Sequence, residues 1–404
     1  MKETQSPSEE MIAGRESHQN EPTSSGISEN VPFFAGRTRR SLVFVLILAA
    51  FFVVAACFII LPGEKDGDDQ VSQQHTSSAS FASTRVAQVK AYSLVQANTG
   101  LMQPAIDAQG NIWVSEMSFN ELVRLDERTG KITTWNVPHA ANGIMRAVLD
   151  RAGNVWFAEQ VANYLGRFDP VTQHFTFYPL PSFKGQSAGP QDLQFNRTGK
   201  LWFTEISAGQ IGRLDPATGH QDFWSLAHPG TTTPLYPYAL TIASDGEVWS
   251  GMFSGGMLVS LNPQTGKITL HHLSNPLTQI TSISADNQGH IWFTEIPSGM
   301  IGRIESTTGA VTEIPLPTQQ ENASEYSNIA IAPTGSVWIA DPGRNALLRY
   351  APQTKTFTLF QLSVRQSTPY GLVFDEQGNL WFTASGATAD YIGVVQASLS
   401  DTLT

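Results

Sequence analysis

Hydrophobic and polar positions repeat in one pattern seven times between residues 86 and 398. Each copy has a short apolar segment, a turn with glycine, an apolar strand with tryptophan, a third short strand, a polar turn and a fourth strand. The Gly-x-x-Trp core recurs every 43 to 47 residues, at 110–113, 153–156, 199–202, 246–249, 289–292, 335–338 and 378–381. Short strands, tight turns and a period in the forties are typical of propeller blades. The pattern therefore predicts an all-β fold, a seven-bladed β-propeller with four strands in each blade.

The seventh copy is incomplete. After Trp381 the sequence offers one further strand, 391–398, before it ends at Thr404. A circular fold with an unpaired blade edge would expose a row of free backbone groups. The stretch VAQVKAYSLV, 86–95, precedes the first copy and has the pattern of a fourth strand. We expect it to complete blade seven and to close the ring.

The N-terminal part has a different pattern. Residues 1–40 are polar and predicted to be a disordered tail, whereas 41–61 contain 21 residues without a charge, enough for a transmembrane helix. Arginines precede this run and acids follow it, which predicts a cytoplasmic N-terminus and an extracytoplasmic propeller at 86–404, joined by a flexible linker at 62–85. The sequence before Cys57 also resembles a lipoprotein cleavage site, but the apolar run continues beyond it and favours an uncleaved anchor.

Charge and cysteine content exclude some functions. The net charge is −11 and the pI is near 5.3, which argues against a nucleic-acid partner because phosphates attract basic surfaces. Cys57 is the only cysteine, so disulfides within the chain and zinc sites built on cysteines are excluded.

Strand directions predict that the loop leaving each tryptophan strand and the loop entering the next blade lie together on one face, called face one here. Three residues after the tryptophan, five copies place an acid there: Glu116, Glu159, Glu205, Glu295 and Asp341. Each of these copies has an arginine eight residues later, and the two copies without the acid lack the arginine. A ring of acids alone suggests a metal site, but the arginines favour ion pairs across adjacent strands, each worth up to about 1 kcal/mol. We therefore interpret the acids as structural.

A second ring begins the innermost strands, 11 residues before each tryptophan, and should face the mouth of the central channel: Met102, Met145, Gln191, Tyr238, Thr281, Ser327 and Tyr370. It suits a partly apolar small ligand and offers no general base. Blades four and seven break the acid–arginine rule and have small loops, 250–257 and 383–391, which indicate either repeat decay or a binding site. The predicted ligand site at face one consists of Tyr238, Met252, Phe253, Ser327, Tyr370 and Ser385.

The sequences WFTEISAGQIGRLDPATG (202–219) and WFTEIPSGMIGRIESTTG (292–309) closely resemble the streptogramin B lyase (virginiamycin B lyase) family, and the likeness covers all seven copies. It implies a magnesium-dependent C–O lyase site on one face, which opens cyclic depsipeptide antibiotics by elimination. It also implies a histidine at the start of the innermost strands of blades six and seven and two nearby glutamates. These positions hold Ser327, Tyr370, Thr368 and Ser385, and hydroxyls are poor replacements for the base that elimination needs.

We therefore predict a propeller that binds a small molecule or a surface partner on face one. No catalytic residue is assigned, and Mg²⁺ is expected only if the activity of the family is kept. Two alternatives remain open. One is a lyase that uses other residues, and the other is a metal-dependent, lactonase-like hydrolase, for which Asn328 and Asp341 are the candidate ligands.

Overall fold

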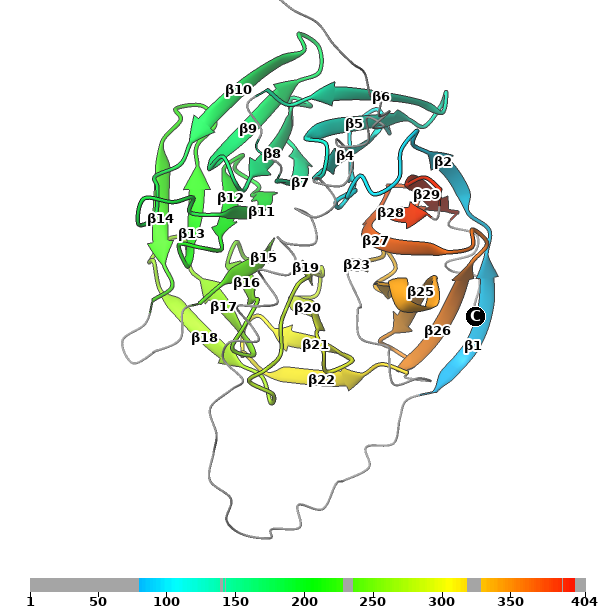
Figure 1. Cartoon of the computed structure of the whole chain (residues 1–404). Coiled ribbons are helices and arrows are strands. Elements are labelled where there is room, and N and C mark those ends of the chain that lie inside the picture. Colours follow the sequence, from blue (N-terminus) through cyan, green and yellow to red (C-terminus); the bar gives the residue numbers. More distant parts are fainter. Residues whose placement is uncertain are drawn as a thin grey trace, which may run out of the picture. The chain divides into compact units, whose positions relative to one another are not determined.

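Seven sheets follow one another around a ring in the computed structural model (Figure 1). It describes residues 80–138, 141, 143–227, 235–317, 328–386 and 388–396. The predicted all-β, seven-bladed propeller is confirmed. The expected tail, the expected membrane anchor at 41–61 and most of the linker lie outside the described residues. Within the described part of the chain, no helix is both long enough and apolar enough to cross a bilayer.

Each blade has four strands, with the first nearest the channel and the fourth at the outer edge (Figure 1). The strands of blades one to three are β3 (Ala105–Ile106), β4 (Ile112–Glu116), β5 (Glu121–Asp126), β6 (Lys131–Asn136), β7 (Ile144–Leu149), β8 (Val155–Glu159), β9 (Tyr164–Asp169), β10 (His174–Pro179), β11 (Pro190–Phe195), β12 (Leu201–Glu205), β13 (Gln210–Leu214) and β14 (Gln221–Ser225). Those of blades four and five are β15 (Pro237–Ile242), β16 (Val248–Met252), β17 (Met257–Leu261), β18 (Ile268–His272), β19 (Ile283–Ala285), β20 (His290–Glu295), β21 (Met300–Glu305) and β22 (Val311–Pro315). Those of blades six and seven are β23 (Ile329–Ile331), β24 (Val337–Asp341), β25 (Ala346–Ala351), β26 (Thr356–Leu362), β27 (Ser367–Phe374), β28 (Leu380–Gly386) and β29 (Tyr391–Val395), with a 3₁₀ turn, η1 (Pro342–Arg344), after β24.

Ring closure follows the prediction, although the closing strand is shorter than the expected 86–95. Strand β2 (Lys90–Ser93) pairs antiparallel with β29 and supplies the fourth strand of blade seven. The buried carboxylate of Asp390, just before β29, accepts hydrogen bonds from the backbone N–H of Thr99 at 2.7 Å and from its hydroxyl at 2.8 Å. The two ends of the propeller chain are therefore joined by a strand pair and by a buried carboxylate.

A further strand was not expected. Strand β1 (Phe81–Ala87) lies parallel to β26 and adds a fifth strand to blade six. The linker expected at 62–85 therefore ends before Phe81. Its polar composition concealed the strand, because β1 is an edge strand on which exposed and half-buried side chains alternate and only Ala87 is fully buried.

The core consists of seven apolar clusters, one between each pair of neighbouring blades. Every repeat tryptophan is buried, with at most 2% of its surface exposed. In six blades a ring from the fourth strand stacks or packs on this tryptophan, as Trp224 does on Trp202 at 5.1 Å between ring centroids. In blade seven this ring is Tyr92 of β2, 6.1 Å from Trp381. The closing strand thus reproduces the packing of the other fourth strands.

Phenylalanine and glycine occur together in the repeat for a steric reason. Where a phenylalanine follows the repeat tryptophan, as Phe203 does, a glycine lies opposite it on the third strand, here Gly212. A Cβ at Gly212 would come within 2.2 Å of the phenylalanine ring. Blade four has no phenylalanine here, and Ser250 lies opposite Val259. The ring therefore covers the glycine, which explains the WF…IGR pattern.

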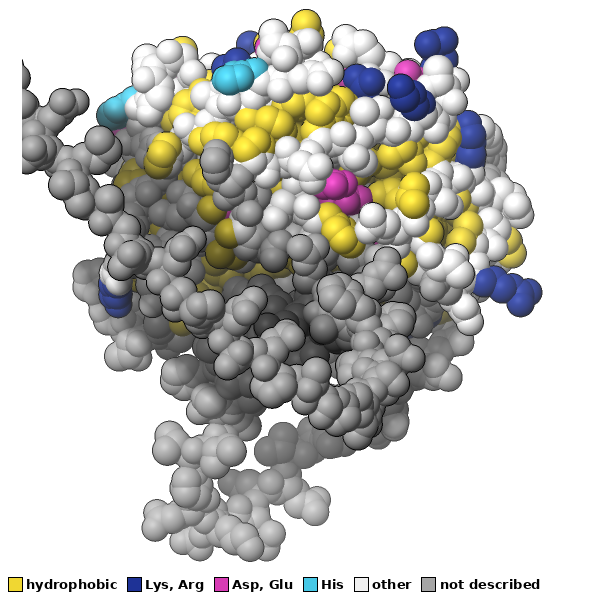
Figure 2. Space-filling view, turned by 45° about the horizontal axis from the view of Figure 1, so that its top comes forward, with side chains coloured by type: hydrophobic (Ala, Val, Ile, Leu, Met, Phe, Trp, Pro, Cys, Tyr) yellow, Lys and Arg dark blue, Asp and Glu magenta, His cyan; other side chains and the backbone are white. Residues whose placement is uncertain are grey.

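Most of the surface visible in Figure 2 is uncharged, with hydrophobic side chains in patches among backbone and other side chains, and the Lys and Arg side chains lie mainly near the upper and right-hand edges of the view.

Candidate functional site

The loops of face one are held together by backbone hydrogen bonds. In blade three the N–H of Ser207, in the turn after β12, donates to the carbonyl of Ala188, in the loop that enters β11, at 3.0 Å. Blade one contains the same link, from Ser118 to Thr99, and blade two contains the neighbouring link, from Gln160 to Gly143, each at 3.0 Å. These links confirm that the two kinds of loop share one face.

The expected acid–arginine pairs are absent from the described structure. The turn after each tryptophan strand is short, so Glu205 lies opposite Gln210, while Arg213 lies opposite Trp202. The guanidinium of Arg213 lies 5.5 Å from the centroid of that indole and forms its ion pair with Asp222 at 2.6 Å. The prediction was wrong because it placed the centre of the hairpin turn too far along the chain.

Four of the five acids, Glu159, Glu205, Glu295 and Asp341, instead contact the turns of their own blades. Glu159 accepts a hydrogen bond from the backbone N–H of Ala162, Glu205 accepts one from the side chain of Gln210, and Asp341 forms an ion pair with Arg344 at 3.2 Å. Burial raises the pKa of these carboxyl groups, to about 7 for Glu205. The acids therefore stabilise hairpin turns, as their structural interpretation requires, but with other partners.

The channel cavity collects most of the predicted second ring. Its lining includes Met102, Gln191, Tyr238, Thr281 and Tyr370. The cavity is small, about 40 Å³, which is room for about three water molecules. Met145 is buried instead in the core between blades two and three, and Ser327 lies outside the described residues.

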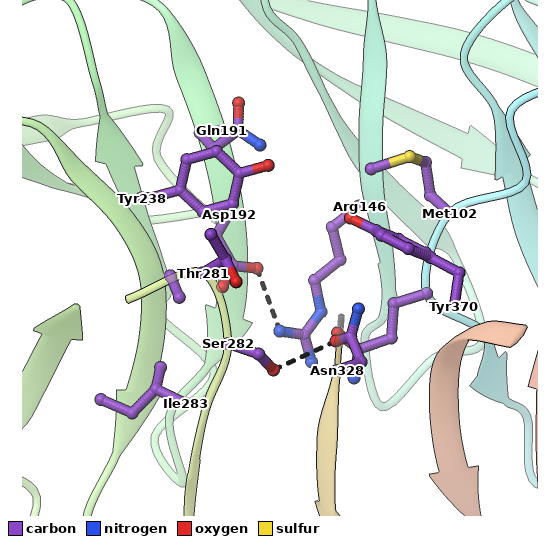
Figure 3. A pocket seen from close by; sticks show the side chains of 12 residues that line it. Met102, Arg146, Gln191, Asp192, Tyr238, Thr281, Ser282, Ile283, Asn328 and Tyr370 are labelled. Atoms are coloured by element: carbon purple, nitrogen blue, oxygen red, sulfur yellow. Dashed lines mark hydrogen bonds and ion pairs between the residues drawn. The ribbon is translucent and has the colours of Figure 1, made fainter. Parts of the chain in front are cut away.

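Tyr238 and Tyr370 meet across the channel although they come from blades four and seven (Figure 3). Burial raises the pKa of both phenols, and the hydrogen bond between them, together with the charge of Asp192, raises that of Tyr238 further. Asn328 also forms a hydrogen bond with Tyr370, which acts in the opposite direction on the pKa of Tyr370. Both tyrosines are therefore neutral hydrogen-bonding groups at physiological pH.

A third ring lies one residue further on, and of its members the sequence had pointed only to Asn328, as a candidate metal ligand. Gln103, Arg146, Asp192, Ala239, Ser282 and Asn328 also line the channel cavity. Simple alternation along a strand would point these side chains away from the preceding ring. In blades two, three, four and seven, however, the pairing of the innermost strand shifts register at this point. Such an irregularity re-aims side chains, so two successive residues reach the channel.

The remaining predicted site residues lie in different surroundings. Met252 is fully buried in the core between blades three and four. Phe253 is half-buried and stacks on Tyr238, with 5.3 Å between ring centroids. The loop of blade four does not open space as expected, because a Cβ at Gly256 would lie 2.1 Å from the carbonyl oxygen of Asn275. Its glycines allow the next loop to pack against it.

Ser385 lies in blade seven opposite Thr368, whose hydroxyl donates to the carbonyl of Ser385 at 3.3 Å. Both residues are near the start of β27, on the face-one side of Tyr370. The family resemblance therefore leads to positions that are adjacent in space, at the edge of the channel mouth.

The comparison with known families decides the assignment. The profile of the virginiamycin B lyase family matches residues 81–232 and 226–400. The chain belongs to the virginiamycin B lyase family. A solved streptogramin B lyase is 26% identical, with a TM-score of 0.66, over 76% of this chain and 96% of that one. A catalytically inactive virginiamycin B lyase from Staphylococcus aureus, solved with quinupristin, is 25% identical, with a TM-score of 0.68, over 76% and 98%. No curated protein sequence matches.

The described residues do not fit the magnesium ion that the virginiamycin B lyase family implies. Mg²⁺ prefers carboxylate oxygens and phosphates, whereas Thr368, Tyr370 and Ser385 offer neutral hydroxyls. In the described part of the chain, no three His, Cys, Asp or Glu side chains gather closely enough to hold a metal ion. Asp341, a candidate for a lactonase-like site, is buried against Arg344. We therefore derive no chemical step through a metal.

Proposed function

We propose that this member of the virginiamycin B lyase family is a binding propeller. It holds a small molecule at the face-one mouth of its channel and does not catalyse opening of the ligand's ring. The observation that carries the proposal is that the side chains at the family's catalytic positions are neutral. Elimination needs a base that removes a proton. At the family's catalytic positions that the structure describes, the chain has two aliphatic hydroxyls and a phenol whose pKa is raised.

The size of the channel limits how the ligand binds. A cavity of about 40 Å³ cannot enclose a drug-sized molecule. The body of the ligand therefore lies over the mouth, against the exposed Thr368 and the half-buried Phe253. Only a small group of it enters the channel, where it meets the phenols of Tyr238 and Tyr370.

Quinupristin is the probe for this proposal, because a solved relative holds it. The full-length chain is incubated with quinupristin and Mg²⁺, binding is followed by ligand-observed NMR, and ring opening is followed by chromatographic retention. We expect binding without ring opening, and weaker binding for Ser385→Trp, which fills the mouth. Ring opening at an ordinary enzyme rate would overturn the proposal in favour of the lyase alternative, and absence of binding would contradict the proposed site.

A gain-of-function variant provides the matched control. Ser327→His, Thr368→Glu, Tyr370→His and Ser385→Glu together restore the residues that the family resemblance implies. If the scaffold still presents the ligand as the lyases do, this variant should open quinupristin while the parent does not. Binding by both proteins with ring opening by neither would show that the ligand lies differently.

We also propose that residues 41–61 anchor the propeller to the outer side of a membrane. The charge difference on the two sides of this apolar run supports the proposal. Protease added to intact cells should then digest the propeller and leave an epitope at the N-terminus protected. Protection of the propeller would contradict it.

A further inference from the structure

One cation reaches the centre of the channel. Arg146, at the start of the innermost strand of blade two, extends its guanidinium into the cavity (Figure 3). About a quarter of its side chain is exposed. No other Lys or Arg is among the described residues that line the cavity.

Asp192 fixes this guanidinium by one edge. Its Oδ1 accepts a hydrogen bond from Nη1 of Arg146 at 3.0 Å and one from the backbone N–H of Leu193 at 2.8 Å. Its Oδ2 accepts one from the backbone N–H of Leu240 at 2.7 Å. Asp192 is thus satisfied by its neighbours. Among the described residues it provides the only hydrogen-bond acceptor of Arg146, so Nε and Nη2 are left for the channel.

Two of the three amides of the lining, Gln191 and Asn328, also direct donors to the cavity, whereas the NH₂ group of the third, Gln103, donates to the carbonyl of Leu372 at 3.3 Å. The side-chain oxygen of Gln191 accepts a hydrogen bond from Gln160 at 2.6 Å, and that of Asn328 accepts one from Ser282 at 3.1 Å. Their NH₂ groups remain for other partners, as in the hydrogen bond between Asn328 and Tyr370. The hydroxyl of Thr281 is buried with no partner among the described residues. The cavity therefore offers mainly hydrogen-bond donors.

We infer that the channel binds a carboxylate group carried by the ligand. A planar carboxylate matches the fork of a guanidinium and accepts several N–H and O–H bonds at once. Its three heavy atoms also suit a space that holds about three water molecules. The inference rests on the proposed function and narrows it, because the apolar body of such a ligand would lie at the mouth while its carboxylate enters the channel.

Phenylacetate and its neutral amide, phenylacetamide, test this inference on the full-length chain. Ligand-observed NMR titrations near neutral pH should give a dissociation constant at least tenfold lower for the carboxylate. Arg146→Lys keeps the positive charge and can keep the contact with Asp192, but it removes the second edge of the fork. We expect this variant to lose most of the preference. Arg124→Lys, on an arginine that lies against Trp113 and is not among the residues lining the channel, is the control and should bind as the parent does.

The outcomes separate this inference from the proposed function. Equal binding of the two probes, no binding of phenylacetate, or an unchanged preference in Arg146→Lys would each overturn the carboxylate site. Should the arginine variant fold poorly, Asn328→Asp provides a second test. A carboxylate placed in the cavity should raise the dissociation constant of phenylacetate at least tenfold more than that of phenylacetamide. Quinupristin tests binding at the mouth independently. If the protein binds quinupristin but does not prefer phenylacetate to phenylacetamide, the proposed function is supported and the carboxylate site is refuted.

Discussion

Replacing the buried acid Glu205 by glutamine should remove a large part of the pH dependence of stability. Glu205 has no exposed surface, and one of its carboxylate oxygens has no hydrogen-bond partner among the described residues. Burial raises its pKa from 4.5 to about 7, against the opposing effect of the hydrogen bond from Gln210. Because its pKa is higher in the folded state, the carboxyl group binds its proton more tightly there, and this stabilises the fold. The stabilisation is complete at pH values below the pKa of the unfolded state and is lost as the pH rises through the pKa of the folded state.

The magnitude follows from the shift. The rise from 4.5 to about 7 is worth about 3 kcal/mol in all, and most of this falls between roughly pH 5 and pH 8. The free energy of unfolding should therefore fall by about that much more in the parent than in Glu205→Gln over this range. Blade four supports an uncharged replacement, because Met252 fills the equivalent position and is fully buried.

Urea unfolding at several pH values measures this difference. Glu376→Gln, at an exposed position, is the control and should leave the pH profile unchanged. Parallel profiles for the parent and Glu205→Gln would refute the reasoning, since they would mean that the carboxyl group titrates alike in the folded and unfolded states.

Three further changes test the packing of the blades, each by urea unfolding. Gly212→Ala should lower the free energy of unfolding by about 1–3 kcal/mol, because the new Cβ would collide with Phe203. The double variant Phe203→Val with Gly212→Val, which copies blade one, should recover most of this loss. An unchanged stability of Gly212→Ala would contradict the steric argument. Tyr92→Ala should cost about 1–3 kcal/mol by removing the ring stacked on Trp381, and a neutral effect would show that closure does not depend on it. Asp150→Ala should cost about 2 kcal/mol, because the indole N–H of the blade-two tryptophan loses an acceptor at 2.9 Å, and a smaller loss than that of an exposed aspartate would count against this role.

The sequence allowed the architecture to be predicted because each blade repeats the same packing problem. The tryptophan positions gave the number of blades, and the missing fourth strand pointed to the segment that contains Lys90–Ser93. The joint presence of the acid and the arginine in five copies was a real regularity of the repeat, but the contact inferred from it was wrong. Arg213 and Glu205 occur together because both belong to the common pattern of the repeat. The hairpin register places the arginine opposite Trp202 and not opposite the acid.

The channel could be predicted only in part. Their place at the start of the innermost strands predicted that Tyr238 and Tyr370 face the channel, and both line its cavity. Arg146, Asp192 and Asn328 were missed as a group because the register shifts at the start of these strands turn two successive residues inward. Irregularities of pairing depend on the neighbouring strand, and the pattern of hydrophobic residues does not record them.

The closing strands also set the order of events during synthesis. Ser83 of β1 lies beside Thr358 of β26, with 3.4 Å between their hydroxyl oxygens, yet the two are 275 positions apart in the chain. A ribosome that adds about 5–20 residues per second needs roughly 14–55 s to span that distance. Throughout this time β1 and β2 have emerged without their partners. The first part of the propeller to be made is therefore the last to be fixed, and a nascent chain must keep these strands from pairing with a neighbouring copy until β26 and β29 have been made.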